Sequence, residues 1–452
     1  MTESATLNEA RGLEAPWPTA RSAWYAAIIL TVANSFAFID RQALALLLQP
    51  IKEDLHASDT VMSLLYGFTF SIFYVCVGIP IARFADRLNR RNIIAASIFV
   101  WSMMTAMCGT ARSFVTLFLA RIGVGAGEAG LNPAAMSMMA DLFPAKRLAS
   151  AMGLYTTGVY IGGGLALILG GLVAGELAQM DPVVLPLIGV VKTWQVIFLL
   201  LGFPGMLLAL LTLTMREPAR RLPRGARVER MPFREVVAQL RRHKWVYVGV
   251  ILGLSLMILV GNGTGAWIPA FLTRKFGWTT AQIGASYGII VITCGIGGAL
   301  SGGFVSSWLK QRGVQRANLM TALTGFLLLV PLTIAFPLVN TPALALILIG
   351  AMNYFAAFNF GGGLAALQEI TPNGMRALTS AGYSLSVNLI GAGFGPLMVA
   401  LFTDRWFGDP NKLPEALALT AGIVSPLALL LLWLGYTHYQ RALDDVQTGE
   451  AR

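Results

Sequence analysis

The sequence predicts an all-α membrane protein with twelve transmembrane helices in two pseudo-symmetric halves of six. Charged residues make up only 12% of the 452 residues, whereas about 25% is usual in soluble proteins. Hydrophobic residues reach 56%, so much of the chain must face lipid as well as a protein interior. The third observation is a set of apolar windows, each with the roughly 20 residues that span a hydrocarbon core.

The apolar windows alternate with polar loops along the whole chain. The first one follows some twenty polar residues and no cleavage-site pattern follows it, so we expect a retained helix rather than a signal peptide. We place the twelve windows at 22–48, 59–85, 92–111, 114–140, 148–175, 193–215, 245–271, 280–309, 317–338, 342–368, 378–403 and 416–439.

The distribution of basic residues predicts the orientation of the chain in the membrane. With the N-terminus inside, 24 of the 33 Lys and Arg residues fall in the tails and cytoplasmic loops, 7 fall in the opposite loops, and Arg41 and Arg121 fall within helices. Because Lys and Arg of short loops stay cytoplasmic, we expect both termini in the cytoplasm and the protein in the plasma (inner) membrane. This topology and anionic membrane lipids account for the net charge of +11 without nucleic acid.

A basic segment divides the chain into residues 1–217, an N-terminal six-helix half, and residues 245–452, a C-terminal six-helix half. The linker at 218–244 is rich in arginine. A possible helix on the membrane surface lies within it, because apolar residues recur at helical spacing beside basic ones. These apolar residues are Phe233, Val236, Val237 and Leu240; the alternative is a solvated linker with one helical turn.

The two halves resemble each other in sequence. Asp141-Leu-Phe-Pro144 and Gly162 have counterparts in Glu369-Ile-Thr-Pro372 and Gly391, which lie 228 or 229 positions further along the chain. A parallel repeat of six-helix halves with a substrate site between them is the construction of alternating-access transporters. Transport is therefore the leading functional hypothesis.

Four charged residues lie inside predicted helices, all in the N-terminal half: Asp40, Arg41, Arg121 and Glu128. A charge in hydrocarbon costs from about 2.5 to more than 10 kcal/mol, so such residues usually pair or face water. Helical rise places Asp40 and Arg121 at a similar depth, so we expect that they can pair across two helices. Asp40 and Arg41 are neighbours and cannot point the same way, so one faces the cavity and the other its edge or another helix.

These charges predict a proton switch. A carboxylate beside an arginine is ionised, and it becomes protonatable when the arginine moves away or the site is desolvated. The three histidines fall in loops or at helix ends, so none competes for this role. A static ion pair that only holds helices together is the alternative.

The loop after the second window carries a dense charge motif, Ala82-Arg-Phe-Ala-Asp86-Arg87-Leu-Asn89-Arg90-Arg91. It resembles the signature loop of the major facilitator superfamily, although Ala82 and Asn89 stand where glycines are expected. The resemblance implies a cytoplasmic gate formed by Asp86, Arg87, Arg90 and Arg91. The second copy, after the eighth window, has lost its acid.

A second resemblance is carried by Asn34, by Asp40-Arg41 and by the run from Arg121 through Gly127-Glu128 to Asn132. Together with Asp-Leu-Phe-Pro, these resemble spinster-type transporters, whose animal members move sphingosine phosphate or lysophospholipids. The resemblance implies that Asp40 and Glu128 couple transport to protons. It also implies that Arg41, Arg121, Asn34 and Asn132 form a network for a substrate head group. Organic anion:cation symporters share the Asp-Arg pair and the Gly-Glu-Ala run and remain a rival.

In the C-terminal half, the seventh and tenth windows would line the cavity if the superfamily arrangement holds. They offer polar and aromatic residues but no buried charge, which suits an amphipathic or lysolipid-like substrate. The alternative is that these side chains pack within their own half. The candidates are Asn262, Asn353, Tyr354, Phe355, Phe358, Asn359 and Phe360.

The chain lacks the residues of a membrane enzyme. The dense polar group has no histidine or cysteine nearby, and the three cysteines, Cys76, Cys108 and Cys294, lie in apolar runs. We therefore expect no enzymatic activity, no metal and no cofactor, with protons as the coupling ion. We also expect a protein that functions as a monomer.

Overall fold

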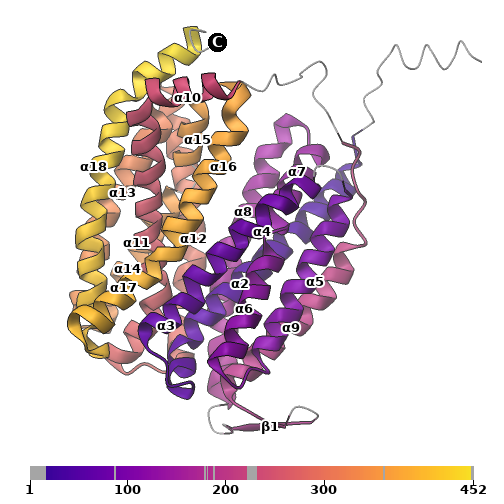
Figure 1. Cartoon of the computed structure of the whole chain (residues 1–452), viewed down its shortest axis with the longest axis vertical. Helices are drawn as coiled ribbons and strands as arrows, with labels where there is room; N and C mark the ends of the chain where they lie inside the picture. The colour runs from indigo at the N-terminus through magenta and orange to yellow at the C-terminus, as the bar shows by residue number, and fades with distance from the viewer. Residues whose placement is uncertain are drawn as a thin grey trace, which may run out of the picture.

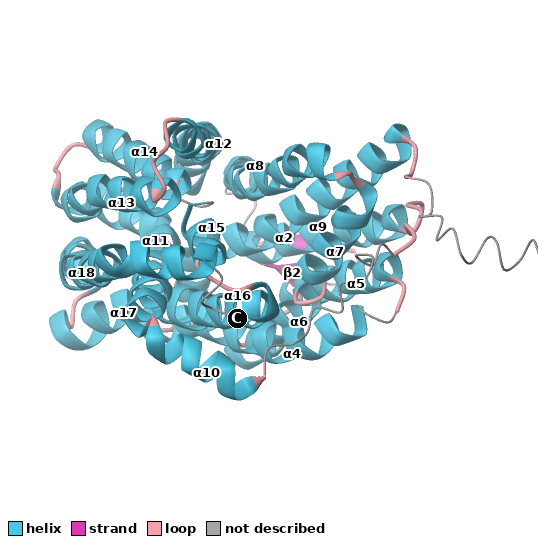
Figure 2. Cartoon of the chain, turned by 90° about the horizontal axis from the view of Figure 1, so that it is seen from above, coloured by secondary structure: helices cyan, strands magenta, loops and turns pink. Residues whose placement is uncertain are grey.

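The computed structural model describes residues 17–85, 88–177, 180, 182–186, 189–220, 232–359 and 362–448. Its helices form two bundles that lie side by side (Figures 1 and 2). Twelve helical segments in the described part of the chain are long and apolar enough to cross a membrane. The predicted all-α class with twelve spans is therefore confirmed.

The N-terminal bundle contains six of these spans, of which the second and fourth each consist of more than one segment. Its helices are α2 (Ala20–Asp54), α3 (Asp59–Ser63), the π-helical turn η1 (Leu64–Phe68), α4 (Thr69–Ala85), α5 (Arg90–Cys108), α6 (Phe114–Glu128), α7 (Leu131–Leu142), α8 (Ala145–Leu177) and α9 (Thr193–Thr212).

The C-terminal bundle contains the other six spans. Its helical segments are α11 (Lys244–Phe276), α12 (Thr280–Gln311), α13 (Ala317–Ala335), η2 (Phe336–Leu338), α14 (Pro342–Phe358), α15 (Gly362–Glu369), η3 (Asn373–Met375), α16 (Arg376–Ser386), the π-helical turn η4 (Val387–Gly393), α17 (Phe394–Leu401), the π-helical turn η5 (Phe402–Phe407), η6 (Pro410–Lys412) and α18 (Leu413–Thr448).

Capping residues explain where several helices begin. The Ser58 side chain accepts a hydrogen bond from the backbone N–H of Val61 at the start of α3. Ser113 begins α6 and Thr279 begins α12, each with a reciprocal capping box. Because the first N–H groups of a helix have no partner within it, these side chains stabilise the helix at the membrane boundary.

The internal repeat is visible as a matching pair of hydrogen bonds. Arg90 at the start of α5 bonds the Asp141 carboxylate. Asn318, 228 positions after Arg90, donates from Nδ2 to Oε1 of Glu369 at 2.8 Å, and Glu369 lies 228 positions after Asp141. The same tie therefore occurs in both halves, with an amide in place of the guanidinium in the second.

The linker helix α10 (Phe233–Arg242) lies across the end of the C-terminal bundle (Figure 1). We expected its apolar face to lie on the membrane surface, but Val236 is only 4% exposed and belongs to the protein core. The helix therefore packs on the bundle. Burial lowers the pKa of His243 at its end, against the opposing effect of the nearby Asp445 carboxylate.

A short β-hairpin joins α8 to α9, which the sequence analysis did not anticipate. Its strands β1 (Val183–Leu185) and β2 (Gly189–Val191) pair antiparallel, with Val184 opposite Val190. Both of these valines are largely exposed. The hairpin lies at the end of the N-terminal bundle away from the chain termini (Figure 1).

The two bundles touch mainly at the end away from the termini, which we call the closed end. A Cβ atom on Gly284 of α12 would lie 2.8 Å from Cα of Gly171 in α8, so the two backbones are in direct contact. Phe68 and Phe394 meet edge to face at the same end, with ring centroids 5.4 Å apart. At the opposite, terminal end, a Cβ on Gly153 of α8 or Gly303 of α12 would meet nothing within 4 Å.

The close contact between α8 and α12 leads to a prediction about two glycines of α12. Gly284→Ala should lower the thermal unfolding midpoint in detergent, because overpacking a close contact costs about 1–3 kcal/mol. Gly303→Ala is the matched control and should leave the midpoint equal or higher, because alanine favours a helix over glycine by about 1 kcal/mol. Equal midpoints for both variants would contradict the close packing of α8 on α12.

Candidate functional site

Arg41 and Glu128 form the central ion pair of the N-terminal bundle. Nε and Nη2 of Arg41 on α2 donate to Oε2 of Glu128 at 2.9 and 2.6 Å. Glu128 is the last residue of α6, directly before the break that separates α6 from α7, and its side chain is 1% exposed. The Arg41 side chain is 25% exposed. Arg41 is therefore the member of the Asp40-Arg41 pair that can be reached from outside the bundle.

Aromatic rings surround the Arg41 guanidinium. Its Cζ atom lies 4.3 Å from the ring centroid of Phe70, 5.1 Å from that of Phe38 and 5.5 Å from that of Tyr74. Ring faces carry partial negative charge and attract a cation most strongly where water is scarce. The guanidinium is thus stabilised by three rings and one carboxylate, and loss of the carboxylate would leave it partly stabilised.

Asp40 points away from Arg41, into the bundle. It is 4% exposed and accepts a hydrogen bond from Oγ1 of Thr105 on α5 at 2.9 Å. The pairing that we expected between Asp40 and Arg121 is not formed among the described residues, because the Asp40 partner is a hydroxyl. A shared depth allowed that pairing, but the direction in which each side chain leaves its helix prevents it.

Arg121 on α6 is fully enclosed and incompletely paired. Its side chain is 1% exposed, and its Nε and Nη1 atoms have no hydrogen-bond partner in the described structure. The second oxygen of Glu128, Oε1, also has none. Buried polar groups without partners are costly and are concentrated at functional sites. The site therefore contains unused donors and an unused acceptor near its ion pair.

The two predicted asparagines hold aromatic side chains in position. Nδ2 of Asn34 donates to the backbone oxygen of Tyr155 at 2.9 Å. Oδ1 of Asn132 accepts from the Tyr155 hydroxyl at 2.5 Å, and its Nδ2 donates to the Tyr74 hydroxyl at 3.1 Å. Tyr74 is one of the rings around Arg41. The asparagines thus connect α2, α4, α7 and α8 around the ion pair.

Sequence reasoning missed the rings and the hydroxyl partner at this site. Phe38 lies three residues before Arg41 and so shares its helix face, while Phe70 and Tyr74 share a face of α4. That spacing was a usable signal for Phe38. No sequence pattern identifies Thr105 or Tyr155, because their positions at the site depend on how separate helices pack.

Most of the predicted cavity residues of the C-terminal half pack within that half. The Tyr354 hydroxyl donates to Oγ of Ser301 on α12 at 2.7 Å, and Phe358 lies 6.5 Å from the Tyr354 ring. Asn359 is 4% exposed and donates to the backbone oxygen of Phe355 at 2.7 Å.

The remaining candidates of that half differ in exposure. Asn262 on α11 is exposed, whereas Asn353 on α14 is half-buried and donates to the backbone oxygen of Ile349 at 2.9 Å. Phe360 lies outside the described residues. The aromatic surface closest to the ion pair is consequently supplied by the N-terminal half, not by α14.

The residues expected to form a gate at the terminal end tie together their own half. Arg90 is 1% exposed; Nε donates to Oε1 of Glu217 at 2.7 Å, and its Nη1 bonds Asp141 and the Ser137 backbone. Arg91 bonds Glu217 through its backbone N–H, at 2.9 Å. Asp86 and Arg87 lie outside the described residues. The described contacts of Arg90 and Arg91 therefore stay within the N-terminal half.

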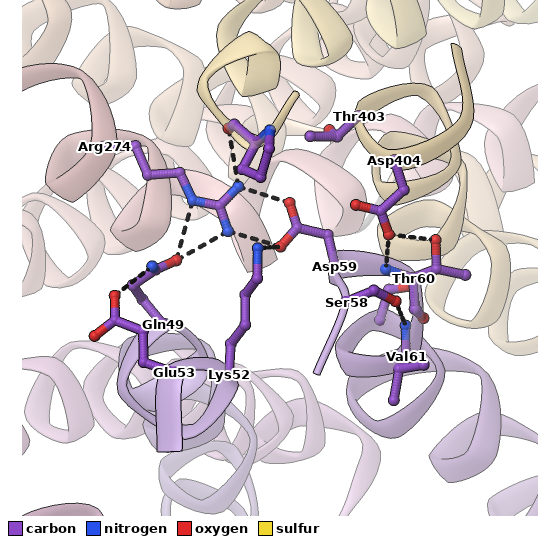
Figure 3. A network of polar contacts seen from close by, with 12 residues as sticks. Gln49, Lys52, Glu53, Ser58, Asp59, Thr60, Val61, Arg274, Thr403 and Asp404 are labelled. Atoms are coloured by element: carbon purple, nitrogen blue, oxygen red, sulfur yellow. Dashed lines mark hydrogen bonds and ion pairs between the residues drawn. The ribbon is translucent and has the colours of Figure 1, made fainter. Parts of the chain in front are cut away.

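A polar cluster joins the two halves at the closed end (Figure 3). Arg274 at the end of α11 donates to both carboxylate oxygens of Asp59 at 2.6 and 2.7 Å, and to Oε1 of Gln49 on α2 at 2.9 and 3.0 Å. Lys52 donates to the same carboxylate at 2.6 Å. Asp59 is completely buried, so this bidentate pair is shielded from water.

A second hydrogen-bonded contact between the two halves lies beside the Arg274–Asp59 pair. Oδ2 of Asp404 in η5 accepts from both the backbone N–H and Oγ1 of Thr60, each at 2.7 Å. Thr60 is in the first turn of α3, where the free N–H groups and the helix dipole favour an anion. We call Gln49, Lys52, Asp59, Thr60, Arg274 and Asp404 the closed-end cluster. No sequence pattern selects these residues, since charged residues are ordinary at the ends of spans.

The closed-end cluster predicts a shift of conformation. Arg274→Gln should separate the halves at the closed end, because it leaves Asp59 without its bidentate partner, a loss of about 3–5 kcal/mol for a buried pair. Nitroxide labels on Thr110 and Asn411, one in each half, should report a longer distance by pulsed electron resonance. Glu415→Gln is the matched control, because it removes an exposed pair with Lys412 at the same end. An unchanged distance for Arg274→Gln would exclude the cluster as a gate.

Arg90 makes a separate prediction about stability. Arg90→Gln should lower the free energy of unfolding by about 3 kcal/mol, because the buried guanidinium that joins Asp141 to Glu217 is lost. Arg91→Gln should cost less, since among the described residues its guanidinium bonds backbone oxygens and Asn92. Unfolding in a denaturing detergent measures both. Equal stability of the Arg90 variant and the unmodified protein would refute this role.

Comparison with known proteins supplies the family. The model of the Major Facilitator Superfamily matches residues 30–396. An MFS-type efflux pump of Mycolicibacterium smegmatis is 27% identical over 94% of this chain and 95% of its own length. A probable L-galactonate transporter of Escherichia coli is 25% identical over 84% of this chain and 83% of its own.

A solved structure is similar over nearly the whole chain. It is a bacterial homolog of the human lysosomal transporter spinster in an inward-facing, unoccupied conformation, with a TM-score of 0.76 and 28% identity over 95% of this chain and 99% of that one. The proteins of this family are transporters and not enzymes, and they work by alternating access. The chain, with its twelve spans and its spinster-like sequence, is an integral multi-pass membrane transporter that belongs to the major facilitator superfamily.

Proposed function

We propose that this transporter is proton-coupled, that Asp40 and Glu128 carry the protons, and that its substrate is an amphipathic or lipid-like small molecule. The observation that supports the proposal is the Arg41–Glu128 pair, in which a partly exposed guanidinium is held by an enclosed carboxylate. A charge pair with one accessible member can exchange partners, unlike a pair that is buried on both sides.

The coupling follows from competition for Arg41. When Glu128 is protonated it can no longer form an ion pair, so the Arg41 guanidinium is released to bind an anionic or zwitterionic head group. The rings of Phe38, Phe70 and Tyr74 hold the guanidinium in place meanwhile. Proton binding at Glu128 and anion binding at Arg41 therefore favour each other, which is a coupling between two sites.

Asp40 and Arg121 form a second part of the proposed proton switch, within the N-terminal bundle. Within the described part of the chain, Asp40 bonds the Thr105 hydroxyl alone, and two nitrogen atoms of Arg121 have no hydrogen-bond partner. Movement of α2 relative to α6 would bring the carboxylate and the guanidinium into contact, and protonation of Asp40 would release them. Asn34 and Asn132 contribute by holding the tyrosines that line this region.

The aromatic surroundings of Arg41 support an amphipathic substrate. Phe38, Phe70 and Tyr74 place an apolar surface directly beside the head-group site, where the apolar part of an amphiphile can lie. The sequence resemblance to spinster-type transporters, whose animal members move sphingosine phosphate or lysophospholipids, supports the same class.

A small carboxylate is the second candidate. Tyr354 and Phe358 pack on α12, so the C-terminal half offers less apolar surface than an amphiphile would use. The similarity to a probable L-galactonate transporter agrees with this alternative. A symporter for such an anion would use the same two arginines.

We further propose that both termini are cytoplasmic and that the protein acts as a monomer in the plasma membrane, with no nucleic-acid partner. The excess of basic residues on the side of the termini supports this orientation. With that orientation, the closed end faces outward and the conformation is inward-facing.

Purified protein in proteoliposomes tests the proposal. An imposed pH gradient should drive uptake of a lysophospholipid, and Glu128→Gln or Asp40→Asn should abolish gradient-driven uptake while substrate exchange partly remains. Binding of the substrate to the unmodified protein should strengthen as the pH falls, because protonation of Glu128 releases Arg41. A sugar acid offered in parallel distinguishes the second candidate.

Glu176→Gln is the control, because Glu176 is an exposed carboxylate at the end of α8. It should keep full gradient-driven uptake. If uptake by the unmodified protein is equal with and without the gradient, the carrier is a facilitator and proton coupling is excluded. Normal gradient-driven uptake by both acid variants would exclude Asp40 and Glu128 as proton carriers.

A further inference from the structure

A groove on the outer face of the C-terminal bundle lies between α13 and α18. It encloses about 350 Å³ and its lining is almost entirely apolar. Met320, Leu323 and Leu327 recur at helical spacing on one face of α13, and Leu429, Trp433 and Tyr436 do the same on α18. Two parallel apolar stripes therefore form its walls over roughly 10 Å of helix.

The groove opens to lipid, not to water or to the other half. Leu327 is 62% exposed and Trp433 58% exposed, although both lie within membrane spans. The ring of Trp433 stacks on that of Tyr436, with centroids 5.9 Å apart. Trp and Tyr are typical of the level where the hydrocarbon meets the head groups. The occupant must therefore come from the bilayer.

Arg316 closes the groove at the end that faces the chain termini. It stands four residues before Met320, on the same face of the chain as the α13 stripe. Its Nε donates to Oε1 of Gln440 at 3.0 Å, its Nη1 donates to the backbone oxygen of Tyr436 at 3.4 Å, and its Cζ lies 5.2 Å from the Tyr436 ring centroid. The arginine thus bridges the two helices that form the walls.

No carboxylate of the described residues neutralises the charge of Arg316. Among the described residues it forms no ion pair, and the carboxylate nearest along its hydrogen bonds, that of Asp444, is reached only through Gln440. An arginine beside an apolar groove at head-group level is complementary to a phosphate with an acyl chain attached.

We propose that this groove is a binding site for a membrane phospholipid, with the phosphate at Arg316 and an acyl chain between α13 and α18. Anionic lipids bind best, because the choline cation of a zwitterionic lipid offsets the attraction of the phosphate. The site is separate from the Arg41–Glu128 pair and lies in the other half, so it does not depend on the proposed substrate.

Native mass spectrometry of the purified full-length protein tests this site with two added lipids, phosphatidylglycerol and phosphatidylcholine. The unmodified protein should retain more phosphatidylglycerol. Arg316→Gln should weaken that retention by about fivefold, the contribution of one basic residue near anionic head groups, and should affect phosphatidylcholine less. Thr324→Phe, which fills the groove from α13, should weaken retention of both lipids.

Two matched variants control for general effects. Leu328→Phe enlarges another exposed residue of α13 that is not part of the groove, and Arg312→Gln removes a nearby cation that stacks on Trp308 instead. Both should bind lipids like the unmodified protein. Unchanged lipid preference in Arg316→Gln would overturn the proposal, as would equal losses in Leu328→Phe and Thr324→Phe.

Inorganic phosphate separates a lipid site from a site for free anions. Phosphatidylglycerol should raise the thermal unfolding midpoint of the unmodified protein more than that of Arg316→Gln, and inorganic phosphate should raise neither. Stabilisation by inorganic phosphate as large as that by the lipid would show that the acyl groove contributes nothing, and would refute the lipid site.

Discussion

The structure depends on the cost of burying charge in an apolar medium. Glu128 and Arg121 are both about 1% exposed within a membrane span, a location that is unfavourable for an isolated charge. One carboxylate oxygen of Glu128 is paired with Arg41, and this pair requires α2 and α6 to lie in a fixed register. The asparagines and tyrosines around them keep that register. The interior of the N-terminal bundle is thus organised around one ion pair, whereas the C-terminal bundle is packed mainly by apolar and small residues.

The two halves are held together in a different way. Glycines bring α8 and α12 into backbone contact, since small residues at a helix interface permit a close approach. The closed-end cluster holds the two halves together at one end of this interface. Its hydrogen bonds join charged and polar groups at one end only, so they can break as a unit while the glycine contacts persist. Small residues therefore allow the two halves to pack closely, and the charged cluster fastens them at one end.

Hydropathy predicted all twelve spans, because span length and apolar composition are local properties of the chain. The functional importance of Asp40, Arg41, Arg121 and Glu128 could be proposed for the same reason, since a charge in an apolar window is conspicuous. The partners of these four charged residues could not be predicted. Depth along a helix follows from counting residues, but the direction of a side chain depends on how the helices rotate against each other. This is why Asp40 bonds Thr105 rather than Arg121, and why the α14 aromatics lie against α12. The apolar face of α10 was recognised from its spacing, yet spacing does not distinguish a lipid surface from a protein surface.

The tie between Arg90 and Asp141 and its counterpart between Asn318 and Glu369 have a consequence for the motion of the molecule. The first places the buried Arg90 guanidinium between two carboxylates, whereas in the second Glu369 accepts from the neutral Asn318 amide and forms a more exposed ion pair with Lys310 at 2.7 Å. Among the described residues, the eleventh span contains two π-helical turns, η4 and η5, and the second span contains one, η1; such turns are places where helices bend readily. The duplicated halves have thus diverged in their polar ties and in the number of helix breaks. We therefore expect the second bundle to bend at more places than the first when the transporter changes conformation.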